Sequence, residues 1–89
     1  MKNTQIAAVF DDIAARLKTK KDNIFKIRAY QKVARAIESL PVSVEQMVKE
    51  NRLNEIPGAG EAITKKLTEL VTTGQLEYYE KLKAESTQD

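Results

Sequence analysis

The chain has 89 residues, of which 42% are hydrophobic, and it contains no cysteine, histidine or tryptophan. A chain of this length forms one domain with a modest core, and the missing residue types exclude disulfides, thiolate nucleophiles, histidine bases and the usual zinc sites. The formal net charge of +2 is too small to indicate a nucleic-acid partner by itself.

The first predicted element is a helix over residues 4–18. Its apolar residues recur at helical spacing, namely Ile6, Phe10, Ile13 and Leu17. We expect Asn3 or Thr4 to cap its start, because short polar side chains accept hydrogen bonds from the first helical amides. No apolar run here is long enough for a signal peptide or a membrane span, so a cytoplasmic protein without a membrane partner is expected.

A second helix is predicted over residues 25–40, ending before Pro41. Its apolar face comprises Ile27, Tyr30, Val33, Ala34 and Ile37, and its opposite face comprises Arg28, Lys32 and Arg35. Lys26 lies one turn before Tyr30, inside the apolar arc. Its amine therefore either extends to the rim of this face or lines a pocket beside the Tyr30 hydroxyl.

The basic residues are concentrated in one part of the chain. Seven basic residues and one acidic residue lie between Lys18 and Arg35, a net charge of +6, so the rest of the chain carries −4. Such segregation suits a polyanion bound along one face of the domain. The alternative is an ordinary solvated helix surface, on which the two signs would alternate more closely.

The central part of the sequence predicts two helices joined by a glycine hairpin. A capping box at Ser43-Val44-Glu45-Gln46 predicts a short helix over residues 44–50, and a turn follows at residues 52–55. Pro57 ends this segment, while Gly58 and Gly60 permit backbone angles that a Cβ forbids. The next helix begins after Gly60 and runs to Thr73, and Gly74 is expected to end it as its C′ residue.

This hairpin is the main candidate for a binding site. The free amides at the start of the helix after Gly60 attract anions, and a nucleic-acid phosphate is the natural one for a basic domain. A hydrophobe followed by Pro-Gly-x-Gly resembles the helix-hairpin-helix motif of DNA-repair proteins, here over residues 44–73. The alternative is that Pro-Gly-x-Gly forms only a turn between two helices.

A last helix is predicted over residues 76–83, followed by a frayed tail at residues 84–89. The fold class is therefore all-α, a single domain over residues 1–89 with a bundle of four to six short helices, and we expect a monomer.

Two neighbouring lysines of the helix after the hairpin face different ways. Lys65 points into water, whereas Lys66 lies at the border of the apolar face set by Ile63, Leu67 and Leu70. Only Lys66 is therefore expected to have a partly desolvated amine, which Schiff-base chemistry with an aldehyde requires. The alternative is that Lys66 is a structural residue at the edge of the core.

Three stretches together resemble the amino-terminal domain of family X DNA polymerases, the DNA polymerase beta type, and most closely its bacterial branch. They are residues 23–32, residues 56–60 with the helix that follows, and residues 73–82. The resemblance implies a helical domain that binds gapped, nicked or abasic DNA at a 5′-phosphate. In some members this domain also removes a 5′-deoxyribose phosphate by β-elimination. It also implies a location at the bacterial nucleoid.

The resemblance also assigns roles to individual residues. Lys66 matches the Schiff-base lysine, and Lys26 and Tyr30 match residues of the 5′-phosphate pocket. The amides around Gly58, Ala59 and Gly60 match a contact to a DNA phosphate. The backbone carbonyls of Asn54, Ile56 and Ala59 match the ligands of a monovalent cation. Na⁺ or K⁺ at the hairpin is then the one expected cofactor, and Lys32 and Lys65 add cations to the DNA-binding surface.

Three positions depart from the lyase-active pattern. Ala62 replaces a lysine, Tyr78 replaces a basic residue and Phe25 replaces a histidine. Losing charge-assisted contacts lowers the affinity for a phosphate, which Lys65 or Lys32 would only partly restore. The polymerase catalytic domain is not among these 89 residues, so we expect either that it lies in a longer protein or in another chain, or that this chain is a free-standing relative.

Three functions therefore stay open from the sequence. The favoured one is DNA binding through the phosphate backbone without reading base sequence. The second is a 5′-deoxyribose-phosphate lyase that uses Lys66. The third is a protein-interaction module, against which the basic stretch from Lys18 to Arg35 argues.

Overall fold

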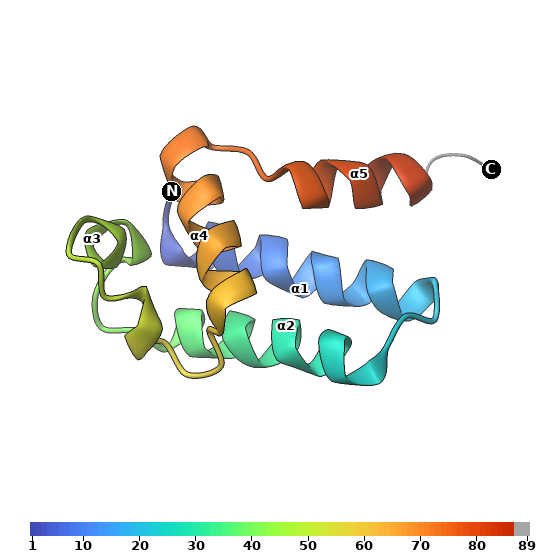
Figure 1. Cartoon of the computed structure of the whole chain (residues 1–89), viewed down its shortest axis with the longest axis horizontal. Coiled ribbons are helices and arrows are strands. Elements are labelled where there is room, and N and C mark those ends of the chain that lie inside the picture. Colours follow the sequence, from blue (N-terminus) through green and yellow to red (C-terminus); the bar gives the residue numbers. More distant parts are fainter. Residues whose placement is uncertain (87–89) are drawn as a thin grey trace.

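The computed structural model describes residues 1–86, and their regular structure is entirely helical (Figure 1). The elements are α1 (Asn3–Thr19), α2 (Ile24–Glu38), α3 (Val44–Lys49), the short 3₁₀ helix η1 (Leu53–Glu55), α4 (Glu61–Thr73) and α5 (Glu77–Ser86). The predicted all-α bundle of short helices is confirmed. Within the described residues, no helix is both long enough and apolar enough to cross a membrane.

α1 and α2 form an antiparallel pair that supplies most of the core (Figure 1). The periodic residues predicted for both helices are buried: Ile6, Phe10, Ile13, Leu17, Ile27, Tyr30, Val33, Ala34 and Ile37. The ring of Tyr30 lies 5.8 Å from that of Phe10 and 6.2 Å from that of Tyr78, measured between ring centroids. A row of three aromatic rings thus joins α1, α2 and α5.

The start of α1 differs from the prediction. The N-cap residue is Lys2, and its amide donates to the side chain of Gln5 at 2.8 Å. Asn3, predicted as a cap, instead donates from its side chain to the carbonyl of Val42 and accepts from the amide of Val44, both at 2.8 Å. Asn3 is recruited across the fold because the amide at the start of α3 needs an acceptor.

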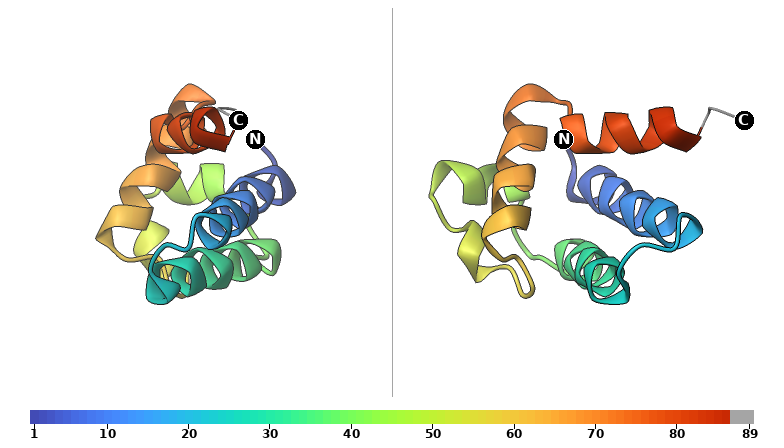
Figure 2. Two further views of the ribbon diagram at one scale, coloured as in Figure 1. Left: turned by 90° about the vertical axis from the view of Figure 1, so that its right-hand side faces the viewer. Right: turned by 45° about the vertical axis from the view of Figure 1, so that its right-hand side comes forward.

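α4 crosses the α1–α2 pair, and α5 returns alongside α1 (Figure 2). Gly74 ends α4 in the left-handed conformation, with φ of +78°, as predicted. The hydroxyl of Tyr79 donates to Asp12 at 2.6 Å, and Arg16 donates to the same carboxylate at 2.9 Å. The Tyr79 bond attaches α5 to α1, and Arg16 holds its acceptor in place from within α1.

α5 extends beyond its predicted end. The helix continues to Ser86, three residues past the expected end at Lys83. The predicted frayed tail at residues 84–89 therefore begins inside α5, and its remaining part, residues 87–89, lies outside the described residues.

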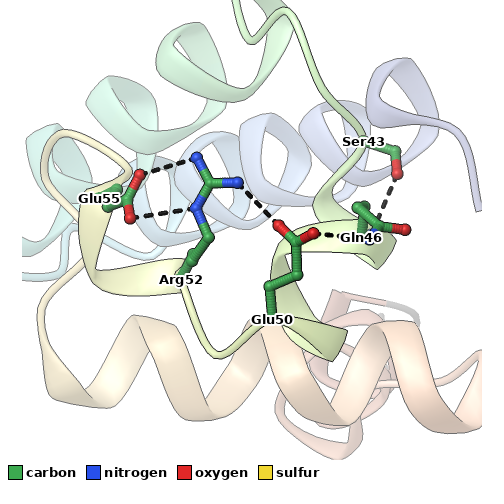
Figure 3. A network of polar contacts seen from close by, with 5 residues as sticks. All are labelled: Ser43, Gln46, Glu50, Arg52 and Glu55. Carbon is green, nitrogen blue, oxygen red and sulfur yellow. Dashed lines mark hydrogen bonds and ion pairs between the residues drawn. The ribbon is translucent and has the colours of Figure 1, made fainter.

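The segment that leads into the hairpin is held by a polar network (Figure 3). Arg52 donates to Glu50 at 2.7 Å and to both carboxylate oxygens of Glu55 at 3.0 and 3.1 Å. Ser43 accepts from the amide of Gln46 at 3.0 Å, so the predicted cap is present, but the side chain of Gln46 donates to Glu50 at 2.8 Å and does not complete the capping box. The guanidinium of Arg52 holds the pKa of Glu55 below its usual value. The network fixes α3 and η1 ahead of the hairpin.

Candidate nucleic-acid interface

The hairpin between η1 and α4 needs a glycine at one position. Gly58 has φ of +86°, a conformation that residues with a Cβ rarely adopt. A Cβ placed there would lie 3.2 and 3.3 Å from two methylene carbons of Lys32. The aliphatic stem of Lys32 therefore lies against the hairpin, and the structure brings these two predicted DNA-binding residues together.

The backbone donors of the hairpin fall into two groups. The amide of Ala59 donates to the carbonyl of Ile56 at 3.0 Å, and the amide of Gly60 donates to the carbonyl of Gly58 at 3.1 Å. These two amides already have acceptors within the hairpin, and their predicted role as phosphate donors stays a prediction. Among residues 1–86, the amide of Gly58 and those at positions 61–63 donate to no protein acceptor. The free donors therefore lie mainly in the first turn of α4.

This helix start carries the positive end of an uninterrupted dipole. α4 has 13 residues, and its N-cap residue is Gly60, which has no side chain to satisfy the free amides. Glu61 is the one acidic residue in the first turn. Lys65 lies one turn later, with its amine 3.6 Å from Glu61, and both side chains are largely exposed. Lys65 thus points into water, as predicted.

The outer face of α2, which meets the hairpin at Lys32, carries exposed cations. Arg28, Lys32 and Arg35 are exposed, as their spacing predicted. In the described part of the chain, none of the three lies within 4.0 Å of a carboxylate oxygen. Their charges are therefore available to a polyanion that lies along α2 and the hairpin.

A second feature is an open cleft of about 630 Å³ between α4 and α5. Its lining residues are Glu61, Ala62, Lys65, Lys66, Glu69, Leu76, Glu77, Tyr78 and Lys81. Lys66 is half-buried, and its amine lies 4.9 Å from the centroid of the Tyr78 ring. Within residues 1–86, Lys66 has no carboxylate partner. The predicted border position of Lys66 is confirmed.

Lys26 and Tyr30 do not line this cleft. The amine of Lys26 lies 3.9 Å from Asp22 and 5.7 Å from the centroid of the Tyr78 ring, and the side chain is 45% exposed. Tyr30 is only 4% exposed, and burial together with the neighbouring Tyr78 raises its pKa well above the ordinary value. Both residues nevertheless contact Tyr78, which lines the cleft: the Tyr30 ring stacks on the Tyr78 ring, and the Lys26 amine lies near it. Their role in a 5′-phosphate pocket stays a prediction.

The side chain of Tyr78 interacts with that of Tyr30 through ring stacking and through its hydroxyl, and this interaction contributes to the raised pKa of Tyr30. The described residues include no buried polar side-chain atom without a partner. Phe25, at the start of α2, is 76% exposed and also lies outside the cleft.

Sequence reasoning missed the carboxylates of the cleft. Glu61 and Glu69 flank Lys65 at intervals of four residues, a spacing that places all three on one side of α4. Glu69 accepts a hydrogen bond from the amide of Glu77 at 2.8 Å and thereby caps the start of α5. The spacing in α4 could have predicted that Glu61 and Glu69 lie on the same side as Lys65. The presence of Glu77 in the cleft could not be predicted, because it depends on how α5 packs.

The hairpin carbonyls are compatible with the predicted monovalent cation. The carbonyl of Ile56 accepts from the amide of Ala59, and that of Ala59 accepts from the hydroxyl of Thr64 at 3.4 Å. Each carbonyl oxygen has two lone pairs, so one remains for a cation, and that of Asn54 accepts no hydrogen bond from a described residue. Among the described residues, no group of acidic side chains could hold a metal ion instead.

Comparison with known proteins adds one finding. A family model described as a helix-hairpin-helix domain matches residues 1–76, which include both helices of the hairpin and the α1–α2 pair. No curated protein matches the chain.

Proposed function

The chain belongs to the helix-hairpin-helix domain family, and from this membership and its surface we propose that it binds the DNA backbone without reading base sequence. Domains of this family are generally associated with non-specific DNA binding. The observation that carries the proposal is that the hairpin, which leads into the free amides of α4, packs on Lys32 of the exposed basic face of α2. Backbone amides and unpaired cations are the groups that proteins use to bind phosphates.

We further propose interrupted DNA, with a gap or a nick, as the preferred partner. The domain would then serve in repair or gap filling at the bacterial nucleoid, either joined to a family X polymerase catalytic domain or as a free-standing relative. A Na⁺ or K⁺ ion held by the carbonyls of Asn54, Ile56 and Ala59 would add positive charge at the hairpin. This ion would strengthen the attraction for a phosphate without reading a base.

Fluorescence anisotropy with labelled duplexes tests the proposal. Two gapped duplexes of unrelated sequence should bind with equal affinity, and log K should fall steeply and linearly with log salt concentration. Removing charge with Arg28→Gln and Arg35→Gln together should lower the affinity and reduce the salt slope by about two. The same loss of charge through Lys2→Gln and Lys83→Gln, away from α2, is the matched control. Affinity that stayed constant from low to high salt would contradict the proposal.

A second candidate function is a lyase, and the position of Lys66 favours it. Lys66 is half-buried at the wall of the cleft, and its amine has no carboxylate partner among the described residues. Such an amine could attack C1′ of the open-chain aldehyde of an abasic deoxyribose and lose water to form an imine. Removal of a proton from C2′ would then expel the 3′-phosphate by β-elimination.

Borohydride trapping on abasic DNA tests this candidate. Reduction of the imine should leave a covalent protein–DNA adduct, which Lys66→Ala abolishes and Lys83→Ala retains. Absence of any adduct with the unmodified protein, or an undiminished adduct with Lys66→Ala, would rule out this chemistry.

A further inference from the structure

The cleft between α4 and α5 contains as many carboxylates as amines. Its charged lining residues are Glu61, Glu69, Glu77, Lys65, Lys66 and Lys81. Two of the amines lie near a carboxylate, Lys65 at 3.6 Å from Glu61 and Lys81 at 3.2 Å from Glu77. Only Lys66 is left without such a partner in the described part of the chain. The cleft is therefore close to neutral, in contrast to the outer face of α2.

A terminal phosphate monoester would find poor compensation in such a cleft. It carries between one and two negative charges near neutral pH, which proteins usually meet with several cations or amides. Here the three amines are balanced by three carboxylates, and two of the amines already lie beside a carboxylate. Within residues 1–86, only the amine of Lys66 is left to meet a phosphate, and the Glu69 carboxylate, which forms no ion pair there, opposes that gain. Ala62, on the same wall, contributes no charge.

Tyr78 also leaves little for a phosphate to bind. Its ring packs on Tyr30, and the amines of Lys66 and Lys26 lie 4.9 and 5.7 Å from the ring centroid. The negative face of an aromatic ring attracts an ammonium group, so this ring already stabilises both amines. Together with Leu76, it gives the cleft an apolar wall that suits a sugar face better than a phosphate.

The cleft continues from the proposed backbone site. Glu61 and Ala62 line the cleft, and their amides belong to the free first turn of α4. A strand whose phosphate binds this helix start therefore has its next sugar close to the cleft.

We propose that the cleft receives the 5′ terminal sugar of an interrupted strand without selecting for a 5′-phosphate. This inference rests on the proposed DNA binding, and it states that this binding does not distinguish a 5′-phosphate from a 5′-hydroxyl. The backbone phosphates bound at the hairpin supply the affinity. The chemical state of the strand end contributes little to it.

Two gapped duplexes that differ only in a 5′-phosphate or a 5′-hydroxyl at the downstream strand test the proposal. Their dissociation constants, measured by anisotropy at one salt concentration, should agree within about twofold, since the cleft has no net charge to offer. A preference of tenfold or more for the 5′-phosphate would overturn the inference while leaving DNA binding intact. If neither duplex binds, the proposed function itself fails, and the inference falls with it.

A gain-of-charge variant sharpens the test. Ala62→Lys adds an amine to the exposed wall of the cleft and should raise the preference for the 5′-phosphate about fivefold. Thr68→Lys adds the same charge to an exposed position of α4 outside the cleft, and it should strengthen binding of both duplexes equally. Circular dichroism checks that both variants keep their helices. An Ala62→Lys variant that gains no preference would show that strand ends do not reach the cleft.

Discussion

The hairpin and the cleft share the first turn of α4 but present opposite chemistry. At the hairpin, the charge comes from backbone amides beside cations that have no carboxylate partner among the described residues. In the cleft, it comes from side chains, and most amines there lie beside carboxylates. The free donors of the hairpin are therefore set by its backbone shape, which requires the positive φ of Gly58.

Because the hairpin and the cleft differ in this way, we expect the hairpin to determine the affinity for DNA and the cleft to determine which strand ends are preferred. A backbone site keeps its charge whatever side chains surround it, whereas a cleft built from side chains gains or loses charge with each substitution. We therefore expect hairpin variants to change the affinity for every DNA, and cleft variants to change only the ranking of DNA ends.

The largest effect is expected from Gly58→Val. A β-branched residue is strongly strained at φ of +86°, and its Cβ would press on the stem of Lys32. We expect a loss of stability of about 2–3 kcal/mol and at least tenfold weaker binding to any duplex. Thermal denaturation and anisotropy measure the two effects. Affinity unchanged in a folded variant would show that the hairpin does not contact DNA.

Removing one charge beside the hairpin should have a smaller effect. Lys32→Met keeps the aliphatic stem that packs on Gly58 but removes the ammonium group. We expect several-fold weaker binding and a salt slope reduced by about one. Lys83→Met, which removes a charge near Glu80 on α5, is the control and should leave both quantities unchanged. Equal effects of the two substitutions would mean that binding depends only on net charge.

Gly60→Ala separates close approach of DNA from folding. Gly60 has φ of −74°, and a Cβ there would meet no atom within 4 Å. The melting temperature should therefore stay the same or rise slightly. DNA binding should weaken about threefold if the backbone of a strand passes close to this residue. An unchanged DNA affinity of the variant would indicate that the strand contacts α2 and does not approach Gly60 closely.

The smallest effect on DNA binding is expected from the α5 contact, which lies away from the hairpin. Tyr79→Phe removes the hydrogen bond to Asp12 and should cost about 1 kcal/mol of stability with no change in the salt slope. A changed salt slope would show that α5 contributes to the DNA-binding surface.

The same contact predicts a pH dependence of stability. Hydrogen bonds from Tyr79 and then Arg16 lower the pKa of Asp12 below its ordinary value near 4. Asp12 therefore contributes stability above that value, and the contribution is lost as the pH falls toward the folded-state pKa. Denaturation midpoints between pH 6 and pH 3 should fall less steeply for Tyr79→Phe than for the unsubstituted protein. Identical slopes would show that Asp12 is not the titrating group.

Much of the fold could be predicted because helical periodicity, helix caps and helix-ending glycines all indicate the same helices. The stripe from Ile6 to Leu17, the cap at Ser43 and the left-handed Gly74 each act within a few residues, and the structure confirms all three. The predicted cap at Asn3 failed because its partners, Val42 and Val44, lie about forty residues away. No pattern within a few residues of Asn3 predicts a contact with residues that lie so far along the chain.

The candidate site was predictable where one helix determines it. The opposite orientations of Lys65 and Lys66 follow from the period of α4 alone. The composition of the cleft was not predictable, because it depends on where α5 places Tyr78 and Glu77. The sequence marked Tyr78 only as the replacement of a basic residue, whereas its ring packs on Tyr30 and lies near the amines of Lys26 and Lys66.

The two hydrogen bonds of Asn3 have a consequence for local opening. They join the first turn of α1 to the start of α3, which precedes the polar network of Arg52 and the hairpin. The amide proton of Val44 can exchange with solvent only when these two segments separate. The hydrogen-exchange protection factor of this amide therefore measures how often the start of α1 separates from the start of α3. Asn3→Ala should lower that factor, while the amides in the central turns of α1 stay protected.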